Sequence, residues 1–222
     1  MLKIILAGED SILIYFGDKI KPELVMKISA AAEQLSQELS DFIIDLTPSY
    51  TSLLLRYDLG KIDYQSLYDK VENCLKNPSA GKIKTGKLIE IPVHYGADFG
   101  LDLQQLLTQK NLKLEDFIQI HAAEEYLVYA IGFSPAFAFL GEVDKSIQAP
   151  RLATPRISIP AGSVGIAENQ TGVYPNKSSG GWNIIGRTPL DLSLKNPANI
   201  DKFSIGDKVK FRPISRREFD EF

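Results

Sequence analysis

Residues 126–141 (YLVYAIGFSPAFAFLG) and 180–189 (GGWNIIGRTP) begin and end the stretch of sequence that decides the fold. Residues 126–189 hold eight of the sixteen glycines, six of the twelve prolines and the only tryptophan. Short β-branched runs alternate there with glycine and proline turns, and turns on a β scaffold are common places for a binding site. The stretch therefore predicts a β architecture with a site on its corners.

The sequence around this stretch extends the same pattern. A strand is expected at Leu88–Val93, followed by two short amphipathic helices at about 101–109 and 114–121. Beyond them only strands and turns are indicated. Further strands are expected at Tyr126–Ile131, Arg156–Ile159, Val164–Ala167, Thr171–Tyr174, Trp182–Gly186 and Lys208–Phe211. Many short strands with glycine and proline corners favour a closed or nearly closed β-barrel over residues 88–222.

The first eighty residues follow a different pattern, in which strands and helices alternate. Pro22 suits the first turn of a helix, and apolar residues recur at helical spacing as far as Leu39. The other elements are expected at Ser11–Phe16, Phe42–Leu46 and Ser52–Tyr57 (strands) and at Ile62–Leu75 (helix). An order close to β-β-α-β-β-α predicts an α+β domain over residues 1–80, with helices on one face of a mixed or antiparallel sheet.

A short segment rich in turn residues separates the two patterns. Asn77-Pro78-Ser79-Ala80-Gly81 breaks the second helix, and the residues that follow are polar. Residues 81–87 are therefore expected to be a linker between an α+β domain and a mainly-β domain.

The composition is that of an ordinary globular protein, with 44% apolar and 24% charged residues. A net charge of −3 gives no reason to expect nucleic acid as a partner. No apolar run approaches the roughly 20 residues that span a bilayer, and the N-terminal apolar run is too short for a signal peptide. The single cysteine, Cys74, is expected to be buried. These features indicate a cytoplasmic protein that binds neither membrane nor nucleic acid.

His121 is the better of two histidine candidates for proton transfer. It ends a predicted helix and precedes Glu124-Glu125, so a carboxylate could orient its ring and tune its pKa toward neutrality. The alternative is a histidine stabilised by the helix C-terminus. His94, at a strand end, is expected to be structural or partly exposed. With two histidines and one cysteine, no metal site is expected.

Three arginines beside turn residues are candidates for binding a carboxylate or a phosphate. Arg151 and Arg156 each follow a proline, which stiffens the backbone before the guanidinium group. Arg187 lies between Gly186 and a Thr-Pro turn. The alternative for these arginines is a structural salt bridge to a nearby acid.

Aromatic residues gather at the same glycine and proline turns. The set comprises Phe133, Phe137, Phe139, Tyr174 and Trp182. Each one alone is typical of a core, but together they suit the wall of a small-ligand pocket or a protein interface. Gln170 and Thr171 add amide and hydroxyl groups that could orient a polar ligand.

The run GFSPAFAFLG at residues 132–141 resembles the Gly-Phe-x-Pro-Gly-Phe-x-Tyr-Leu-Gly signature of the KipI/PxpB family, also called allophanate hydrolase subunit 1-like. Further family motifs match in order at residues 91–96, 99–103, 150–151, 155–156, 160–164, 170–175, 180–189 and 206–211. The resemblance covers essentially the whole chain, and the ordered series of motifs is specific.

The resemblance implies an N-terminal α+β domain followed by a cyclophilin-like β-barrel. It also implies a subunit, inactive alone, of a bacterial 5-oxoprolinase, which opens 5-oxoproline to glutamate with ATP, expected together with Mg²⁺. The implied partners are a subunit 2-like (KipA/PxpC) protein and a LamB/YcsF-type (PxpA) subunit. One branch of the family inhibits a sporulation histidine kinase, so a non-catalytic inhibitor of a sensor histidine kinase is the alternative. An amide-processing complex with a urea-derived substrate is a third possibility.

Three positions depart from the family pattern: Ala136 replaces a glycine, Phe139 a tyrosine and Ser179 a proline. A methyl group at Ala136 is costly if that residue adopts a positive φ. The departures lie within the expected binding region, so they affect the expected ligand more than the fold. Besides His121 as the candidate catalytic residue, the candidates for binding substrate or ATP are Phe133, Pro135, Phe137, Arg151, Arg156, Gln170, Thr171, Tyr174, Trp182 and Arg187.

Overall fold

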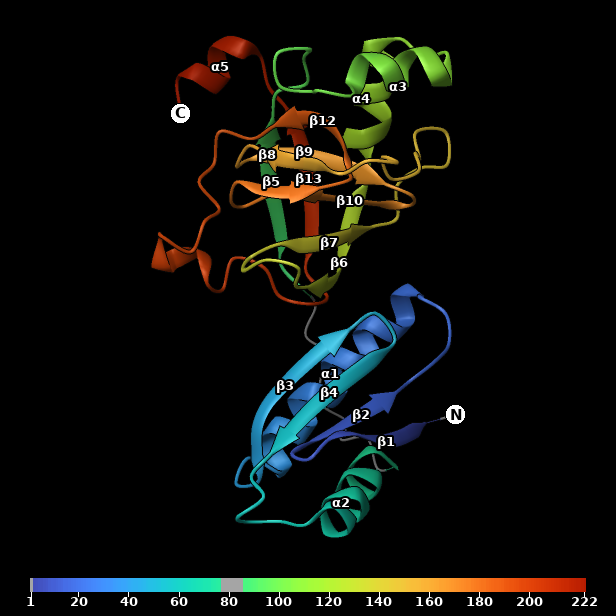
Figure 1. Ribbon diagram of the computed structural model, residues 1–222, viewed down its shortest axis with the longest axis vertical. Helices are drawn as coiled ribbons and strands as arrows, with labels where there is room; N and C mark the ends of the chain where they lie inside the picture. Colours follow the sequence, from blue (N-terminus) through green and yellow to red (C-terminus); the bar gives the residue numbers. More distant parts are fainter. Residues whose placement is uncertain (1, 77–85) are drawn as a thin grey trace. The chain divides into compact units, whose positions relative to one another are not determined.

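In the computed structural model, which describes residues 2–76 and 86–222, the chain separates into two units, Met1–Thr85 and Gly86–Phe222 (Figure 1). Residues 81–85 of the expected linker lie outside the described residues. Residues 86 and 87 belong to the second unit, where the Lys87 backbone N–H donates to the Asp207 carboxylate at 3.0 Å.

The first unit is an antiparallel sheet with two helices on one face. Its strands pair in the order β1 (Lys3–Gly8), β2 (Ser11–Tyr15), β4 (Ser52–Tyr57), β3 (Ile43–Ser49). Side chains of a strand alternate between the two faces of a sheet, so alternate residues of β2 and β4 point to one core. Helices α1 (Pro22–Glu38) and α2 (Tyr64–Lys76) contribute side chains to the same core. The order is β-β-α-β-β-α, as expected, although β1 was not among the strands expected by residue range. Cys74 lies in this core, as predicted.

Seven strands of the second unit form a closed ring. Their pairing order is β5 (Leu88–Val93), β13 (Lys208–Pro213), β6 (Glu125–Ile131), β7 (Ala138–Gly141), β10 (Gln170–Val173), β9 (Ser163–Ala167), β12 (Asn183–Arg187). Only β5 and β13 pair in parallel. His94, just after β5, pairs with Arg187 through N–O distances of 2.9 and 3.0 Å, and this bridge closes the ring.

Two further strands and four helical segments complete the second unit. Strands β8 (Arg156–Ile159) and β11 (Ser178–Gly180) form a separate antiparallel pair. Helices α3 (Leu103–Lys110) and α4 (Leu114–Ala123) contribute Leu106 and Phe117 to the core inside the ring. The 3₁₀ turn η1 (Pro197–Asn199) and helix α5 (Arg216–Asp220) lie near the C-terminus.

The expectation that only strands and turns follow residue 121 is wrong at α5. The Ser215 hydroxyl accepts the Glu218 backbone N–H, and the Glu218 carboxylate accepts the Ser215 backbone N–H. This capping box satisfies backbone donors that the first turn of a helix leaves unpaired.

Across residues 2–76 and 86–222, no helix combines the length and the apolar character that crossing a membrane requires.

Candidate functional site

The wall of the ring buries side chains on both faces. On β9, Val164 and Ile166 belong to the core inside the ring, whereas Ala167 belongs to a second cluster on the other face. The same alternation on the neighbouring strands follows from the pleat of a β-strand. The second cluster, called here the aromatic cluster, consists of Phe137, Ile159, Ala167, Tyr174, Trp182 and Ile184, with Phe139 packed against it.

Glycines on this face leave room for the aromatic rings. A Cβ atom on Gly172 would lie 3.2 Å from the Phe137 ring and 3.4 Å from the Trp182 ring. A Cβ atom on Gly180 would lie 2.5 Å from the Tyr174 hydroxyl. The rings therefore pack directly on backbone, which only glycine permits at such close approach.

The structure brings together all five aromatic residues of the expected set. The Phe137 ring centroid lies 4.9 Å from that of Phe139, 5.3 Å from that of Tyr174 and 5.5 Å from that of Trp182, all edge to face. The Phe133 ring joins them at 5.4 Å from Phe137 and 6.3 Å from Tyr174. Phe133 is nevertheless 63% exposed, so it is the member of the set that a ligand or a partner can reach.

The turn that carries Phe133 has an unusual backbone. Phe133 and Ala136 have φ angles of +67° and +66°, in the left-handed region that favours glycine. Three backbone hydrogen bonds hold the turn: Gly132 N–H to Phe137 O at 3.1 Å, Ser134 N–H to Gly132 O at 2.8 Å, and Phe137 N–H to Ser134 O at 3.0 Å. Pro135 is exposed in the same turn. Such strained residues often cluster at functional sites.

Arg156 forms a structural ion pair. Its guanidinium donates two hydrogen bonds, of 2.8 and 2.6 Å, to the carboxylate of Asp102, which is 4% exposed. Asp102 also accepts the Ile184 backbone N–H at 2.7 Å. The pair links β8, the start of α3 and β12, so Arg156 is engaged in the salt bridge that was the alternative to ligand binding.

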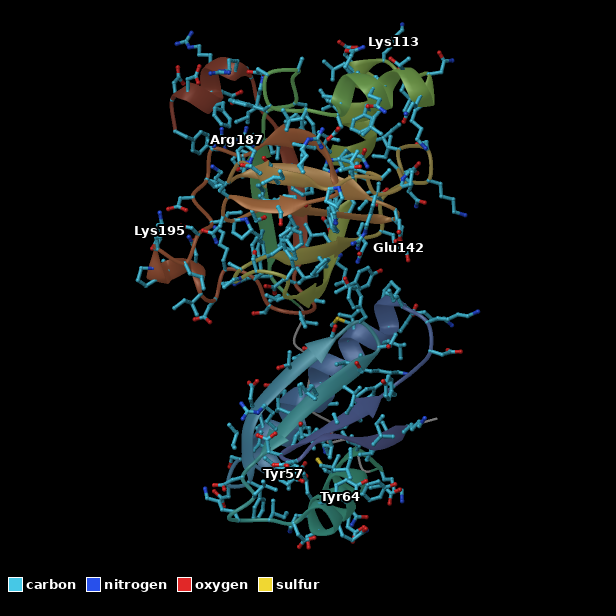
Figure 2. All side chains as sticks on the ribbon, viewed as in Figure 1. Tyr57, Tyr64, Lys113, Glu142, Arg187 and Lys195 are labelled. Atoms are coloured by element: carbon cyan, nitrogen blue, oxygen red, sulfur yellow. The ribbon has the colours of Figure 1, made fainter. Side chains whose placement is uncertain are left out.

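Arg187 lies at the ring closure, at the end of β12 (Figure 2). Its Nε donates to the Ala161 carbonyl at 2.9 Å, and its guanidinium lies 5.4 Å from the centre of the Phe99 ring. These contacts place Arg187 in a polar group that includes His94 rather than among the rings of the aromatic cluster.

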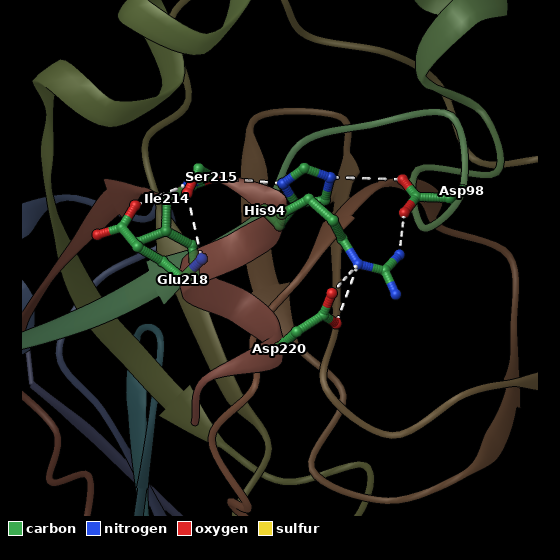
Figure 3. Close-up of polar contacts among 7 residues, drawn as sticks. His94, Asp98, Ile214, Ser215, Glu218 and Asp220 are labelled. Carbon is green, nitrogen blue, oxygen red and sulfur yellow. Dashed lines mark hydrogen bonds and ion pairs between the residues drawn. The ribbon is translucent and has the colours of Figure 1, made fainter.

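Figure 3 shows the polar contacts that hold α5 near this closure. The His94 ring has Nδ1 at 3.2 Å from the Ile214 carbonyl and Nε2 at 3.5 Å from the Asp98 carboxylate. Arg216 joins Asp98 to Asp220 and lies 4.8 Å above the Phe99 ring. His94 is mostly buried and structural, and the sequence patterns did not single out Asp98 or Arg216.

His121 is fully buried and belongs to a continuous series of hydrogen bonds in the core inside the ring, called here the main core. Its Nε2 lies 3.0 Å from the Thr171 hydroxyl, and its Nδ1 lies 2.8 Å from the Tyr95 hydroxyl. Because Thr171 donates its proton to the Gly165 carbonyl at 3.0 Å, His121 Nε2–H donates to Thr171 and Nδ1 accepts from Tyr95. Neutral imidazole therefore satisfies every partner.

The expectation that Glu124 or Glu125 orients the His121 ring is wrong, because hydroxyl groups take both nitrogens. Burial lowers the pKa of His121 to about 3. The ring is therefore uncharged at pH 7, and its pKa is not close to 7 as expected. Thr171 belongs to the same series of hydrogen bonds and faces the main core. Gln170, half-buried, begins the same strand β10.

Tyr174, in the aromatic cluster, is only 1% exposed. Burial raises the pKa of Tyr174 to about 12, against the opposing effects of a hydrogen bond from the Trp182 backbone and the charges of Arg151 and Arg156. The phenol thus keeps its proton. Within the part of the chain that the structure describes, no group of three or more His, Cys, Asp or Glu side chains could hold a metal ion.

Comparisons with known proteins place this geometry in a family. The family described as "Carboxyltransferase domain, subdomain C and D" matches residues 2–199. A Bacillus subtilis (strain 168) protein, named as the B subunit of 5-oxoprolinase, is 38% identical over 227 residues, covering 97% of this chain and 94% of that protein. A protein of the same name from Haemophilus influenzae is 38% identical over 182 residues, covering 82% of this chain and 84% of its own length.

Solved structures show the same fold. A crystal structure of TTHA0988 matches with a TM-score of 0.80 and 30% identity, covering 97% of this chain. The chain spans only 40% of the length of TTHA0988. The Kluyveromyces lactis urea carboxylase matches with a TM-score of 0.73 over 99% of this chain and 22% of that one; at 16% identity it shows the fold alone.

The family match covers most of the chain, and the Bacillus relative aligns along nearly all of it. The chain therefore belongs to the carboxyltransferase subdomain C and D family and, within it, to the KipI/PxpB group of proteins related to the B subunit of 5-oxoprolinase.

Proposed function

We propose that this chain is one subunit of an ATP-dependent 5-oxoprolinase that opens 5-oxoproline to glutamate. The observation that carries the proposal is its 38% identity with the 5-oxoprolinase B subunit of Bacillus subtilis over 97% of the chain. The proposed partners are a subunit 2-like (KipA/PxpC) protein and a LamB/YcsF-type (PxpA) subunit. The word "subunit" in the names of the curated relatives supports the presence of partner chains.

In the proposed reaction, ATP with Mg²⁺ is a co-substrate that activates an otherwise stable amide. The γ-phosphoryl group is transferred to the lactam oxygen, and water then adds to the carbonyl carbon. The carbon–nitrogen bond then breaks and the nitrogen takes a proton, which leaves an acyl phosphate. A second water hydrolyses this acyl phosphate, so one ATP and two waters give glutamate, ADP and phosphate. Consumption of ATP is the basis for proposing that the complex works in the cytoplasm.

Within this scheme the second unit, proposed to be a cyclophilin-like barrel, presents the aromatic cluster to substrate or partner. The exposed ring of Phe133 supports this role, as does the strained turn that carries it. The candidate binding residues at this face are Phe133, Pro135, Phe137, Arg151, Tyr174 and Trp182. The complete hydrogen bonding of His121 supports a role in positioning β10, and proton transfer by His121 stays a prediction.

The test is co-expression and purification of this chain with its two proposed partners, followed by a 5-oxoproline assay. Glutamate and ADP should form in equal amounts only when all subunits are present, and each subunit omitted in turn provides the control. A complex that releases no glutamate from 5-oxoproline would contradict the proposal. Suppression of histidine kinase autophosphorylation by this chain alone, in the same preparation, would favour the inhibitor alternative.

A further inference from the structure

The geometry points to Phe133 as an anchor that inserts into an apolar pocket on a partner chain, an inference that rests on the proposed function. Two segments of the second unit carry both a buried member of the aromatic cluster and a large exposed apolar side chain. In the turn before β7, Phe137 is buried and Phe133 is exposed. On β8, Ile159 is buried and Ile157 is 94% exposed. Exposed apolar side chains next to one buried cluster are typical of a protein interface.

The other rings of the aromatic cluster are too buried to form the wall of a ligand pocket. Phe137 and Tyr174 are each 1% exposed, and Trp182 is 5% exposed. A small ligand binds in a concave site that covers most of its surface. Among the five aromatic residues, Phe133 alone is exposed. A single projecting ring is complementary to a pocket on another chain, so a protein partner fits this surface better than a small molecule.

The Phe133 ring is held in position within the free chain. Its plane stands at 73° to the Phe137 ring and at 90° to the Tyr174 ring, with centroid distances of 5.4 and 6.3 Å. The three backbone hydrogen bonds of residues 132–137 hold the turn beneath it. A side chain that is already ordered loses little conformational entropy when a partner binds, as expected for a residue that dominates the binding energy.

The backbone of Phe133 also favours a role in binding over a role in folding. A left-handed φ is unfavourable for a bulky side chain, whereas glycine adopts it freely. Because the ring is mostly exposed, its burial offsets little of that cost. Strain that packing does not explain is characteristic of functional sites, where a residue is kept at the expense of the stability of the free chain.

The experiment measures how tightly this chain binds its two proposed partners, mixed together, without 5-oxoproline or ATP. Isothermal titration calorimetry gives the Kd. Phe133→Gly removes the ring and should raise the Kd at least about 30-fold, the effect of truncating a dominant interface residue. Ile157→Ala should raise it by a smaller factor, roughly 2- to 10-fold. Phe222→Ala is the matched control, because Phe222 is 67% exposed without a positive φ, and it should leave the Kd within about twofold.

The stability of the free chain gives a second readout. In Phe133→Gly, relief of the strained φ opposes the loss of the ring contacts, so the melting temperature should stay within about 4 °C of the wild type. A larger fall with an unchanged Kd would assign the ring to folding and overturn the inference.

Hydrogen exchange of the wild-type chain needs no variant. The amides of residues 132–137 should exchange at least about tenfold more slowly in the complex than in the free chain, because a partner that covers Phe133 also restricts opening of its turn. Unchanged exchange in this turn on formation of the complex would contradict the inference.

Three further outcomes would overturn the inference while 5-oxoprolinase activity stands. Phe133→Gly could weaken binding no more than Phe222→Ala or Ile157→Ala does. It could raise the KM for 5-oxoproline or ATP without changing the Kd, which would assign the ring to a small ligand. The free wild-type chain could sediment as a dimer that Phe133→Gly dissociates, which would assign the ring to a second copy.

The wild-type proteins separate this inference from the proposed function. If they associate through Phe133 but do not open 5-oxoproline, the proposed reaction fails and the anchor stands. If they open 5-oxoproline and Phe133→Gly binds normally, the anchor alone fails. If they do not associate, both fail.

Discussion

Arg156 and Asp102 form a two-pronged ion pair between the β8 strand and the residue that precedes α3, with N–O distances of 2.8 and 2.6 Å. Because Asp102 is buried, its carboxylate finds its hydrogen-bond partners in this guanidinium and in the Ile184 backbone N–H. The geometry separates two arginines that look equivalent in sequence: one is committed to the structure, while Arg151 is not.

Removing the Arg156 guanidinium should therefore cost stability. We expect Arg156→Ala to lower the free energy of unfolding by roughly 3 kcal/mol, because the Asp102 carboxylate stays buried without its cation. Urea unfolding followed by circular dichroism measures the loss. Arg56→Ala breaks the exposed pair with Asp10 and should cost less than about 1 kcal/mol. Equal losses for the two variants would mean that Arg156 is free to bind a ligand.

Replacing Ala136 should stabilise the protein. Its φ of +66° is strained for a residue with a Cβ atom, so Ala136→Gly should raise the free energy of unfolding by about 1 kcal/mol. The corresponding increase in melting temperature is about 2–4 °C. Ala153→Gly, at an exposed position without a positive φ, should not stabilise. A lower melting temperature for Ala136→Gly would show that the strain is offset by contacts of the methyl group.

The packing of rings on Gly172 predicts a spectroscopic effect, since Trp182 is the only tryptophan. In Gly172→Ala, the new methyl group would lie 2.9 Å from the Ala138 carbonyl and 3.2 Å from the Phe137 ring. We expect a loss of about 1–3 kcal/mol and a red shift of the Trp182 fluorescence as the cluster loosens. At Gly132, a Cβ atom would meet nothing within 4 Å, so Gly132→Ala is the control. An unchanged emission spectrum in Gly172→Ala would contradict the observed packing.

Most strands of the second unit could be predicted from the sequence because each is a short apolar run between turn residues. Strands β7 and β11 were missed: the first is part of the aromatic turn motif, and the second, Ser178–Gly180, is polar and pairs only with β8. Helix α5 was missed although Ser215 and Glu218 have capping-box spacing, because five residues are too few for a periodic apolar pattern.

The sequence could predict which residue types form the site but not which side chains contact one another. The five aromatic residues could be grouped because they share glycine and proline turns. The sequence could not show that Arg156 forms an ion pair and Arg151 does not, since this difference depends on Asp102, which is 54 residues from Arg156 in sequence. The burial of His121 was equally hidden, because Tyr95 and Thr171 reach its ring from distant segments.

Arg216 should control the docking of α5. It joins Asp98 to Asp220 and covers the Phe99 ring, so Arg216→Ala removes several contacts at once. We expect amide hydrogen exchange in residues 216–220 to accelerate at least tenfold, while global unfolding changes by less than about 1 kcal/mol. Arg217→Ala removes only an exposed pair with Glu221 and should leave exchange nearly unchanged. Equal exchange in both variants would show that other contacts hold α5.

His121 should make the stability of the protein depend on pH. Burial lowers its pKa from 6.5 to about 3 in the folded protein, so the unfolded chain binds a proton more readily. The stabilisation is complete above pH 6.5 and is lost as the pH falls toward 3, at up to about 1.4 kcal/mol per pH unit. Urea unfolding at pH 7.5, 6.5, 5.5 and 4.5 measures this slope. His121→Gln should reduce this slope, with His94→Gln as the comparison.

Because substitution of a buried residue also changes stability through packing, the NMR titration of the two histidine rings in the native protein provides a second measurement. The His121 signal, assigned with His94→Gln, should not shift above pH 4.5, and a midpoint near pH 6.5 would contradict the buried neutral ring.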